Sequence, residues 1–508
     1  MKINYLYIKY VCVGLGLFGM QSCDNILDIK PVENNVATSF YSSETEIKQA
    51  VVGIYARLGR NGTNTDFPTD YYLLASEDRS DIRYLGGGET SAQNDQLELR
   101  KYLITPYSGT VQSIFARLYA MIKEANNLLY YTEEGSYMRY RAEAAFLRAF
   151  AYSELARSFG PVGLVLEPVE NGVATQVERT PLVDIYKQVI QDLQYAAANL
   201  EPFYTDDDAG RVGSVAANAL LGEVYMTMAG YPLQDEGAYV LAEETFEGII
   251  EQVTQRFSPE YADVFTLENE NKYDIFSVQF ASGNQGLGSS LPGYISGSGS
   301  SSTPFPEWAY PTFRQLGQDL RVDSVLINEM IKNQDKRVAS TVDLGYWNSL
   351  DPENRRWISS TILTKFLEKD RTNERIKDWN DYPRNFPIIR PADILLQYAE
   401  ALVKNGKESS AIPYINKIRE RAGVSLFTSG LSLEDIKRER KFEFIGEGKR
   451  FFDLVRWGKE EAVSTLSAFA KHYHSRTNGQ LPTERDLLLP IPQVELNTRT
   501  NWKQNEGY

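Results

Sequence analysis

Cysteine is scarce in this chain of 508 residues, which contains only Cys12 and Cys23. Cys12 lies in an apolar run, 11–20, that follows Lys2 and Lys9. A basic start before an apolar run too short to cross a bilayer is typical of an export signal. Cleavage before Cys23 would remove Cys12 and leave a single thiol. An exported chain with one cysteine forms no internal disulfide, so its core alone must hold it together.

Long apolar runs and basic blocks are also missing. Beyond the first 22 residues, no stretch approaches the roughly 18 apolar residues that a membrane-spanning helix needs. No Lys/Arg-rich block appears and the net charge is −15, so nucleic acid is not an expected partner. The hydrophobic content of 42% is that of a globular protein, and the length is ample for a sizeable core.

Enzymatic motifs are weak as well. Gly446–Lys449 lacks the glycine spacing and the Ser/Thr of a phosphate loop. His472 and His474 would point to different sides of a helix, and no Cys/His cluster accompanies them. The 68 Asp and Glu residues single out no carboxylate pair of the kind that glycosidases use. We therefore expect no metal, no cofactor and no catalytic residue.

Cys23 follows the apolar run directly behind the small residue Ser22, as the modified cysteine of bacterial lipoproteins does. Met20 and Gln21 depart from the usual residues of that motif. Three acyl chains on such a cysteine would give stable membrane attachment, where one chain would be marginal. We predict a signal peptide at 1–22 and a lipidated tether at 23–40. An ordinary signal peptide with a chance cysteine is the alternative.

Helical patterning dominates from 41 to 255. Apolar residues at three- and four-residue spacing predict helices over 43–58, 111–131, 137–159, 181–200, 214–229 and 237–253. Alanines alternate with large aromatic residues in these segments, which lets paired helices pack closely. The helix–turn–helix pairs have the size of tetratricopeptide units, although no clean repeat of about 34 residues is present. The N-terminal half is thus predicted to be a scaffold of helical pairs.

The pattern changes between 256 and 390, where Gly, Ser, Pro and aromatic residues become frequent. Gly283–Thr303 is nearly all small residues, which is typical of a mobile surface loop. A linker between two domains is the competing interpretation. Helices are predicted again over 391–404, 409–421 and 432–455, before an extended tail. The expected fold is therefore mostly α, with an irregular, loop-rich central region.

A dense charge pattern marks the last predicted helix. Arg438, Arg440 and Lys441 alternate with Glu439 and Glu443. Spacings of three and four residues allow ion pairs along one helix face. We interpret the pattern as structural salt bridges, with a catalytic cluster as the weaker alternative.

Nine segments occur in an order that is characteristic of one family. The N-terminal half contains YAMIKEANNLL (119–129), RAEAAFLRAFAYSELARSFGPVGLV (141–165), TPLVDIYKQVIQDLQYAAANL (180–200) and GSVAANALLGEVYMTMAG (213–230). The C-terminal third contains IIRPADILLQYAEAL (388–402), INKIRERAG (415–423), IKRERKFEFIGEGKRFFDLVRWGK (436–459), LPIPQVEL (489–496) and the terminal QNEGY. Together they resemble the SusD/RagB family of Bacteroidetes outer-membrane nutrient-binding lipoproteins. Glu506 stands where the family usually has proline.

This resemblance implies a SusD-like fold, with a helical N-terminal region at 41–255 and a RagB/SusD domain at 256–508, whose helical C-terminal part is 391–508. It also implies a lipid-anchored protein on the cell surface that binds oligosaccharides or polysaccharides. Such a protein acts as a lid on a SusC-like TonB-dependent transporter in the outer membrane. An oligopeptide-binding lid is the alternative, and a surface hydrolase is a remote third possibility.

Aromatic residues are abundant, with 32 Tyr, 23 Phe and 6 Trp. Their flat apolar faces suit sugar rings, while Asn, Asp and Arg bind hydroxyls. Ligand contacts are predicted in 66–107, at Tyr71, Tyr72, Asp78, Arg79, Asp81, Tyr84 and Asn94. Others are predicted in 283–310, at Asn284, Gln285, Tyr294, Trp308 and Tyr310, with Trp347, Trp357 and Trp379 as further candidates. For each aromatic residue, packing in the core is the alternative.

Overall fold

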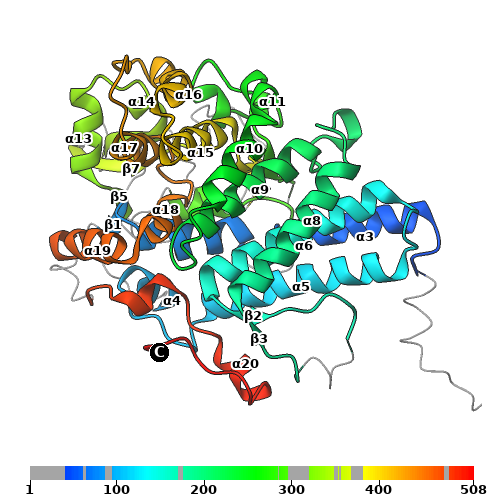
Figure 1. Ribbon diagram of the computed structural model, residues 1–508. Coiled ribbons are helices and arrows are strands. Elements are labelled where there is room, and N and C mark those ends of the chain that lie inside the picture. Colours follow the sequence, from blue (N-terminus) through cyan, green and yellow to red (C-terminus); the bar gives the residue numbers. More distant parts are fainter. Residues whose placement is uncertain are drawn as a thin grey trace, which may run out of the picture. The chain divides into compact units, whose positions relative to one another are not determined.

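The structure is a computed structural model of the whole chain (Figure 1). It describes residues 40–60, 65–85, 94–169, 175–283, 285–295, 320–347, 353, 356–367, 381–473 and 480–508. Residues 48–508 form one compact unit. The preceding unit contributes residues 40–47, which include the start of helix α3 (Glu44–Ala56). Within the described residues, no helix is long and apolar enough to cross a membrane.

Packed helices make up the N-terminal half. They are α5 (Gly109–Tyr131), α6 (Met138–Phe159), α8 (Leu182–Asn199), α9 (Ser214–Ala229), α10 (Ala238–Glu247) and α11 (Ile250–Gln255). From α5 to α10, each helix packs on the next along the chain (Figure 1). In α6, Ala142, Ala149 and Ala151 are fully buried, because small side chains let neighbouring helices approach closely. The predicted succession of packed helices is confirmed, except that 237–253 divides into α10 and α11.

The C-terminal third adds a second group of helices. It contains α15 (Pro391–Lys404), α16 (Glu408–Ala422), α17 (Leu433–Glu443), α18 (Arg450–Trp457), α19 (Lys459–Tyr473) and α20 (Gln493–Thr498). Helix α15 lies at its centre and packs on α10, α16 and α17. Since α10 belongs to the N-terminal half, the two groups share one core.

The single helix predicted over 432–455 is wrong, because the chain turns between α17 and α18. Gly446 and Gly448 adopt φ of +85° and +69° there, a region that favours glycine. A Cβ on Gly448 would lie 2.3 Å from the carbonyl oxygen of Tyr72. The turn therefore needs glycine both for its backbone conformation and for its close approach to another segment.

Short strands and short helices connect these groups. The described strands form antiparallel pairs: β1 (Arg83–Leu85) with β5 (Leu320–Val322), β2 (Val162–Gly163) with β3 (Arg179–Thr180), β4 (Phe276–Val278) with β8 (Phe386–Ile389), and β6 (Val342–Trp347) with β7 (Trp357–Leu363). The longer of the short helices are η1 (Pro68–Ser76), α4 (Asn94–Arg100), α12 (Leu291–Ile295), α13 (Ser324–Lys332) and α14 (Val338–Thr341). The remaining turns are η2 (Glu77–Arg79), η3 (Asp206–Asp208), η4 (Ala262–Phe265), η5 (Leu267–Asn269) and η8 (Glu484–Leu487). The mostly α fold class is confirmed, with these elements filling the central region.

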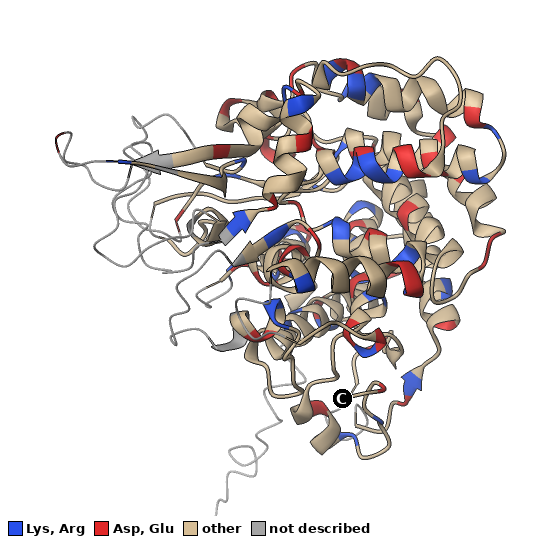
Figure 2. Ribbon diagram, turned by 90° about the vertical axis from the view of Figure 1, so that its left-hand side faces the viewer, with Lys and Arg blue, Asp and Glu red and all other residues tan. Residues whose placement is uncertain are grey.

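The C-terminal segment 480–508 returns to the N-terminal helices, as Figure 1 shows where it passes β2 and β3. The Leu489 N–H donates to the Ser158 carbonyl at 2.7 Å. Asn505 Nδ2 donates to the Phe159 carbonyl at 3.0 Å. These bonds satisfy the backbone at the end of α6 and hold the tail in place. Figure 2 shows basic and acidic positions interspersed along the helices.

Candidate ligand site

Tyr71 and Tyr72, predicted as ligand contacts, lie in the core of the protein. Both belong to η1, in which every side chain is buried. The Tyr71 ring stacks on Phe67 with centroids 4.9 Å apart, and the Tyr72 ring stacks on Phe386 at 5.3 Å. Burial raises the pKa of both hydroxyls well above the ordinary value. The expectation of a surface loop here is wrong, because protein atoms already cover these rings.

Asp78 and Arg79 are buried in the same segment. Arg100 Nε donates to Asp78 Oδ2 at 2.8 Å. The guanidinium of Arg79 lies 4.2 Å from the centroid of the Phe451 ring, a cation–π contact. Burial lowers the pKa of Arg79. These side chains therefore join elements of the fold and do not face a ligand.

Asp81 connects the N-terminal segment to the C-terminal helices. Its carboxylate accepts from Lys441 Nζ and from Arg450 Nε, each at 2.7 Å. Burial alone would raise the pKa of Asp81, but the two cations outweigh it and hold the pKa below its usual range. Asp81 is thus an ion-pair partner in the interior, and its predicted place on a surface loop is wrong.

Tyr84 is half-buried, and its ring forms an aromatic stack. The ring packs face to face on Tyr473 of α19, with centroids 3.8 Å apart and an interplanar angle of 17°. The Tyr473 hydroxyl donates to Asp323 Oδ1 at 2.6 Å, which fixes the pair. Sequence reasoning missed Tyr473, because a position at the end of a helix gives no sign of a partner on a distant strand.

The other predicted contacts divide into four groups. Gln285 is exposed, between β4 and α12. Tyr294 is buried in α12, so its predicted loop position is wrong. Asn94 begins α4, and its side chain is not described. Asn284, Trp308, Tyr310, the further candidate Trp379 and the lipidation residue Cys23 lie outside the described residues.

Trp357 presents half of its side-chain surface to solvent at the start of β7. It stands opposite Trp347 in the β6–β7 register. The hydroxyl of Thr361, further along β7, donates to the Val322 carbonyl of β5. Since β5 pairs with β1, the strands that carry Trp357 and Tyr84 are connected. We call Tyr84, Trp357 and Tyr473 the strand edge.

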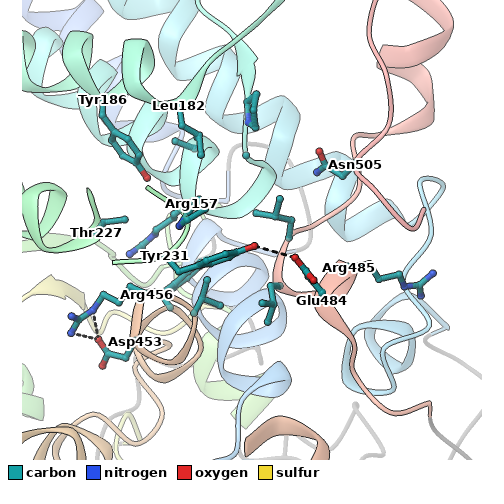
Figure 3. Close-up of a pocket in the computed structure, with 18 of the residues that line it drawn as sticks. Arg157, Leu182, Tyr186, Thr227, Tyr231, Asp453, Arg456, Glu484, Arg485 and Asn505 are labelled. Atoms are coloured by element: carbon teal, nitrogen blue, oxygen red, sulfur yellow. Dashed lines mark hydrogen bonds and ion pairs between the residues drawn. The ribbon is translucent and has the colours of Figure 1, made fainter. Parts of the chain in front are cut away.

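A separate cavity of about 550 Å³ opens among the helices (Figure 3). Its walls come mainly from α6, α8, α9, α18 and the C-terminal segment, with one residue each from α15 and α17. The polar and charged lining residues include Arg157, Tyr186, Glu223, Thr227, Gln397, Arg440, Lys449, Asp453, Arg456 and Glu484. The apolar ones include Ala156, Leu182, Phe452, Val455, Leu487 and Leu488. Sequence reasoning missed this cavity, because its walls are far apart in the chain.

The buried charged groups in the cavity wall are already paired. Arg157 Nη1 donates to Glu223 Oε1 at 3.1 Å, and its guanidinium lies 4.0 Å from the Phe452 ring centroid. Burial alone would lower the pKa of Arg157, but the neighbouring Glu154 and Glu223 raise it well above the ordinary value. Lys449 Nζ lies 2.8 Å from the carboxylate of Asp393. The wall therefore holds both signs of charge in balanced pairs.

Tyr231 extends across the cavity from the turn after α9 (Figure 3). Its hydroxyl donates to Glu484 Oε1 at 3.4 Å, so a weak hydrogen bond links that turn to the C-terminal segment. Tyr186 of α8 points inward from the opposite wall (Figure 3). Tyr231 lies between the helices predicted over 214–229 and 237–253, where the sequence gives no sign of a binding site.

The dense charges of 436–459 form salt bridges, as predicted, but their partners differ from the prediction. Glu443 accepts from Arg337 at 2.9 Å and from Arg390 at 2.6 Å, and it also pairs with Arg421. Burial alone would raise the pKa of Glu443, but the three guanidinium groups lower it below its usual range. Its partners come from other elements, so the ion pairs connect the fold and do not run along one helix face.

No group of three His, Cys, Asp or Glu side chains is arranged to hold a metal ion in the part of the chain that the structure describes. His472 packs edge-on against Tyr473, with ring centroids 4.5 Å apart. His474 lies outside that part.

Two family models match this sequence. The model described as "SusD family" matches residues 255–508. The model described as "Starch-binding associating with outer membrane" matches residues 26–226. Between them they cover both halves of the chain.

Two curated proteins are similar to the chain over nearly their whole length. SusD-like protein P25 of Formosa agariphila is 26% identical, covering 98% of this chain and 97% of that protein. The starch-binding protein SusD of Bacteroides thetaiotaomicron is 23% identical, covering 96% of each.

Solved structures show the same fold. A laminarin-binding SusD-like protein is 26% identical with a TM-score of 0.74, covering 92% of this chain and all of that one. A SusD homologue from Bacteroides thetaiotaomicron is 21% identical with a TM-score of 0.78, covering 94% of this chain and 99% of that one.

Proposed function

The chain belongs to the SusD family, and from this premise we propose that it is a cell-surface lipoprotein that binds oligosaccharides or polysaccharides. The observation that best supports glycan binding is the likeness to the laminarin-binding relative, which extends over 92% of this chain. The protein acts by recognition and carries out no chemical step. Its ligand is a glycan released or displayed near the cell surface.

The strand edge is the proposed contact for the polymer. The exposed side chain of Trp357 and the half-buried rings of Tyr84 and Tyr473 offer aromatic surface to a ligand. The apolar face of a pyranose ring packs on such surfaces, and each contact adds about 1 kcal/mol. Few contacts of this size give dissociation constants of about micromolar to millimolar. Shallow binding of this kind suits a protein that must also release its ligand.

Its location follows from the proposed lipid on Cys23. A triacylated cysteine attaches the protein to the outer membrane without a spanning helix, and residues 23–40 act as the tether. The match to a family described as associating with the outer membrane supports this location. There we propose that it works as a lid on a SusC-like TonB-dependent transporter, which takes up the captured glycan.

Calorimetry and affinity electrophoresis against laminarin, starch, xylan and mucin glycans test glycan binding. We expect saturable binding of at least one polymer by the purified protein, with no release of products. A folded protein that binds none of a broad panel contradicts the proposal. Peptides that co-purify with the protein would indicate an oligopeptide-binding lid instead.

The transporter partnership needs a separate test. Affinity purification of the tagged protein from its native outer membrane should recover a SusC-like transporter in stable association. Recovery of the protein alone from gently solubilised membranes argues against the lid. This result leaves the glycan-binding proposal untouched, since the two assays measure different surfaces.

A further inference from the structure

We infer that the cavity among α6, α8, α9, α18 and the C-terminal segment is a second binding site, for a neutral mono- or disaccharide. It is distinct from the strand edge, because its lining includes none of Tyr84, Trp357 and Tyr473. The class of ligand rests on the proposed glycan-binding function. The site itself rests on the geometry of the cavity.

The first observation is a tyrosine hydroxyl that opens into the cavity. Tyr186 exposes 3% of its surface and lines the cavity, with its hydroxyl directed inward (Figure 3). Among the described residues this hydroxyl has no hydrogen-bond partner. Since no protein group among the described residues satisfies it, water or a ligand in the cavity must do so. A ligand hydroxyl in the cavity would supply the missing partner.

A second polar group stands in the same wall. Gln397, of which 2% is exposed, uses its amide Nε2 to donate to Asp393 Oδ1 at 2.9 Å. Its side-chain oxygen has no partner among the residues that the structure describes. The cavity thus offers Tyr186 as donor or acceptor and Gln397 as acceptor. Sugar hydroxyls both donate and accept, and can satisfy both groups.

The balance of charge favours a neutral ligand. An anion would meet Glu223 and Asp453 in the lining, and a cation would meet Arg157 and Arg456. Asp453 and Arg456 are hydrogen-bonded to each other at 2.9 Å, so neither is available to neutralise an ionic ligand without losing its partner. Breaking such a buried pair costs more than the new contact returns. A polyhydroxylated neutral compound binds without disturbing the pairs.

The shape and size of the cavity suit a neutral mono- or disaccharide. A volume of about 550 Å³ lies within the roughly 300–1,000 Å³ of ordinary small-molecule sites. The ring of Tyr231 extends across the space, and Leu182 and Phe452 line it. Aromatic and aliphatic faces beside unpaired polar groups match the two faces of a pyranose ring.

Three variants test the inference, with glucose and laminaribiose as probes. Tyr186→Phe removes the single unpaired hydroxyl with little change in shape, and should weaken binding of the bound probe about five- to ten-fold. Thr227→Trp places a large side chain at a half-buried position of the cavity wall, and it should abolish binding of the probe in the cavity. Glu329→Gln, a surface control at an exposed ion pair outside the cavity lining, should leave the probe affinity unchanged. Ligand-observed NMR titration measures affinity, and crystals soaked with the probe show where it lies.

The outcomes separate this inference from the proposed function. Laminarin binding with an empty cavity in soaked crystals overturns the inference and leaves glycan binding intact. Unchanged probe affinity in Tyr186→Phe also overturns it, even if Thr227→Trp fails to fold. A peptide found in the cavity overturns the saccharide assignment. If no saccharide binds anywhere on the folded protein, the proposed function fails, and the ligand class inferred here fails with it.

Discussion

Segment 66–81 and the strand edge have similar side chains but opposite surroundings. Both contain aromatic rings, and the sequence predicts ligand contacts in both. Tyr71 and Tyr72 are covered by other rings and expose 0% and 1% of their surfaces, whereas Trp357 exposes 50%. The difference shows that an aromatic residue becomes a ligand surface only where the fold leaves one face of the ring uncovered.

The largest expected difference between the two regions is in stability. Removing an aromatic ring should lower the free energy of unfolding far more in segment 66–81 than at the strand edge. Tyr72→Ala leaves a cavity beside Phe386 and should lower the free energy of unfolding by about 3–5 kcal/mol. Trp357→Ala should change it by less than about 0.5 kcal/mol, since half of the side chain is already in water. Urea unfolding followed by circular dichroism measures both. Equal losses of stability in the two variants would contradict the difference between segment 66–81 and the strand edge.

Removal of a charge in segment 66–81 should have the next largest effect on the free energy of unfolding. Asp81→Asn deprives two half-buried cations, Lys441 and Arg450, of their buried carboxylate partner and should cost about 3 kcal/mol at neutral pH. The matched control is Glu329→Gln, which breaks the exposed pair with Arg438 and should cost less than about 1 kcal/mol. Urea unfolding at neutral pH compares them. A loss as small in Asp81→Asn as in the control would show that Asp81 is not a structural residue.

The effect of Asp81 should also depend on pH. The pKa of Asp81 is lowered in the folded protein, against about 3.9 for an unfolded aspartate. Its stabilisation is therefore fully present above that value, and is lost as the pH falls through the folded-state pKa. Acid titration should consequently bring the stabilities of the wild type and Asp81→Asn together. A gap that stays constant down to the acid transition would contradict this coupling.

At the strand edge the expected effect is on binding. Trp357→Ala should weaken laminarin-type polymer binding by about 1 kcal/mol, or roughly five-fold, because one stacking face is lost. Trp357→Phe keeps an aromatic face and should retain most of the affinity. Calorimetry with a binding polymer measures both variants. If neither changes affinity while the protein still binds, the polymer lies elsewhere.

The smallest effect on either region should come from Cys23→Ala. Loss of the lipid should release the protein from the membrane and impair uptake, while the affinity for glycan and the free energy of unfolding stay unchanged. Fractionation of cells and calorimetry on the released protein measure the two properties. A variant that remains in the membrane fraction would disprove the predicted lipidation.

The helices were predictable where local pattern and packing agree. The Ala-rich stretch 137–159 became α6 at Met138–Phe159, because small residues on all sides suit a helix surrounded by other helices. The stretch 432–455 was predicted as one helix, since apolar and charged spacing continues through it. Its interruption depends on the approach of Gly448 to Tyr72, a contact between segments that no local pattern reveals.

Site residues were harder to predict than helices, for the same reason. Tyr84 was recognised as an aromatic candidate, but its partner Tyr473 lies 389 positions further along the chain (473 − 84). Tyr186 falls in the helix predicted over 181–200 and Tyr231 between two predicted helices, and neither position indicates the cavity that the two residues share. Residue type and spacing carry no information about which distant side chains meet.

By itself, the sequence determined the mostly helical scaffold and the family, because periodicity and ordered motifs are local properties. The tertiary structure alone decided which of many tyrosines face solvent and which charges pair in the core. It also decided that α6, α8, α18 and the C-terminal segment enclose a cavity. Burial depends on contacts between residues far apart in the chain, and such contacts exist only once the chain is folded.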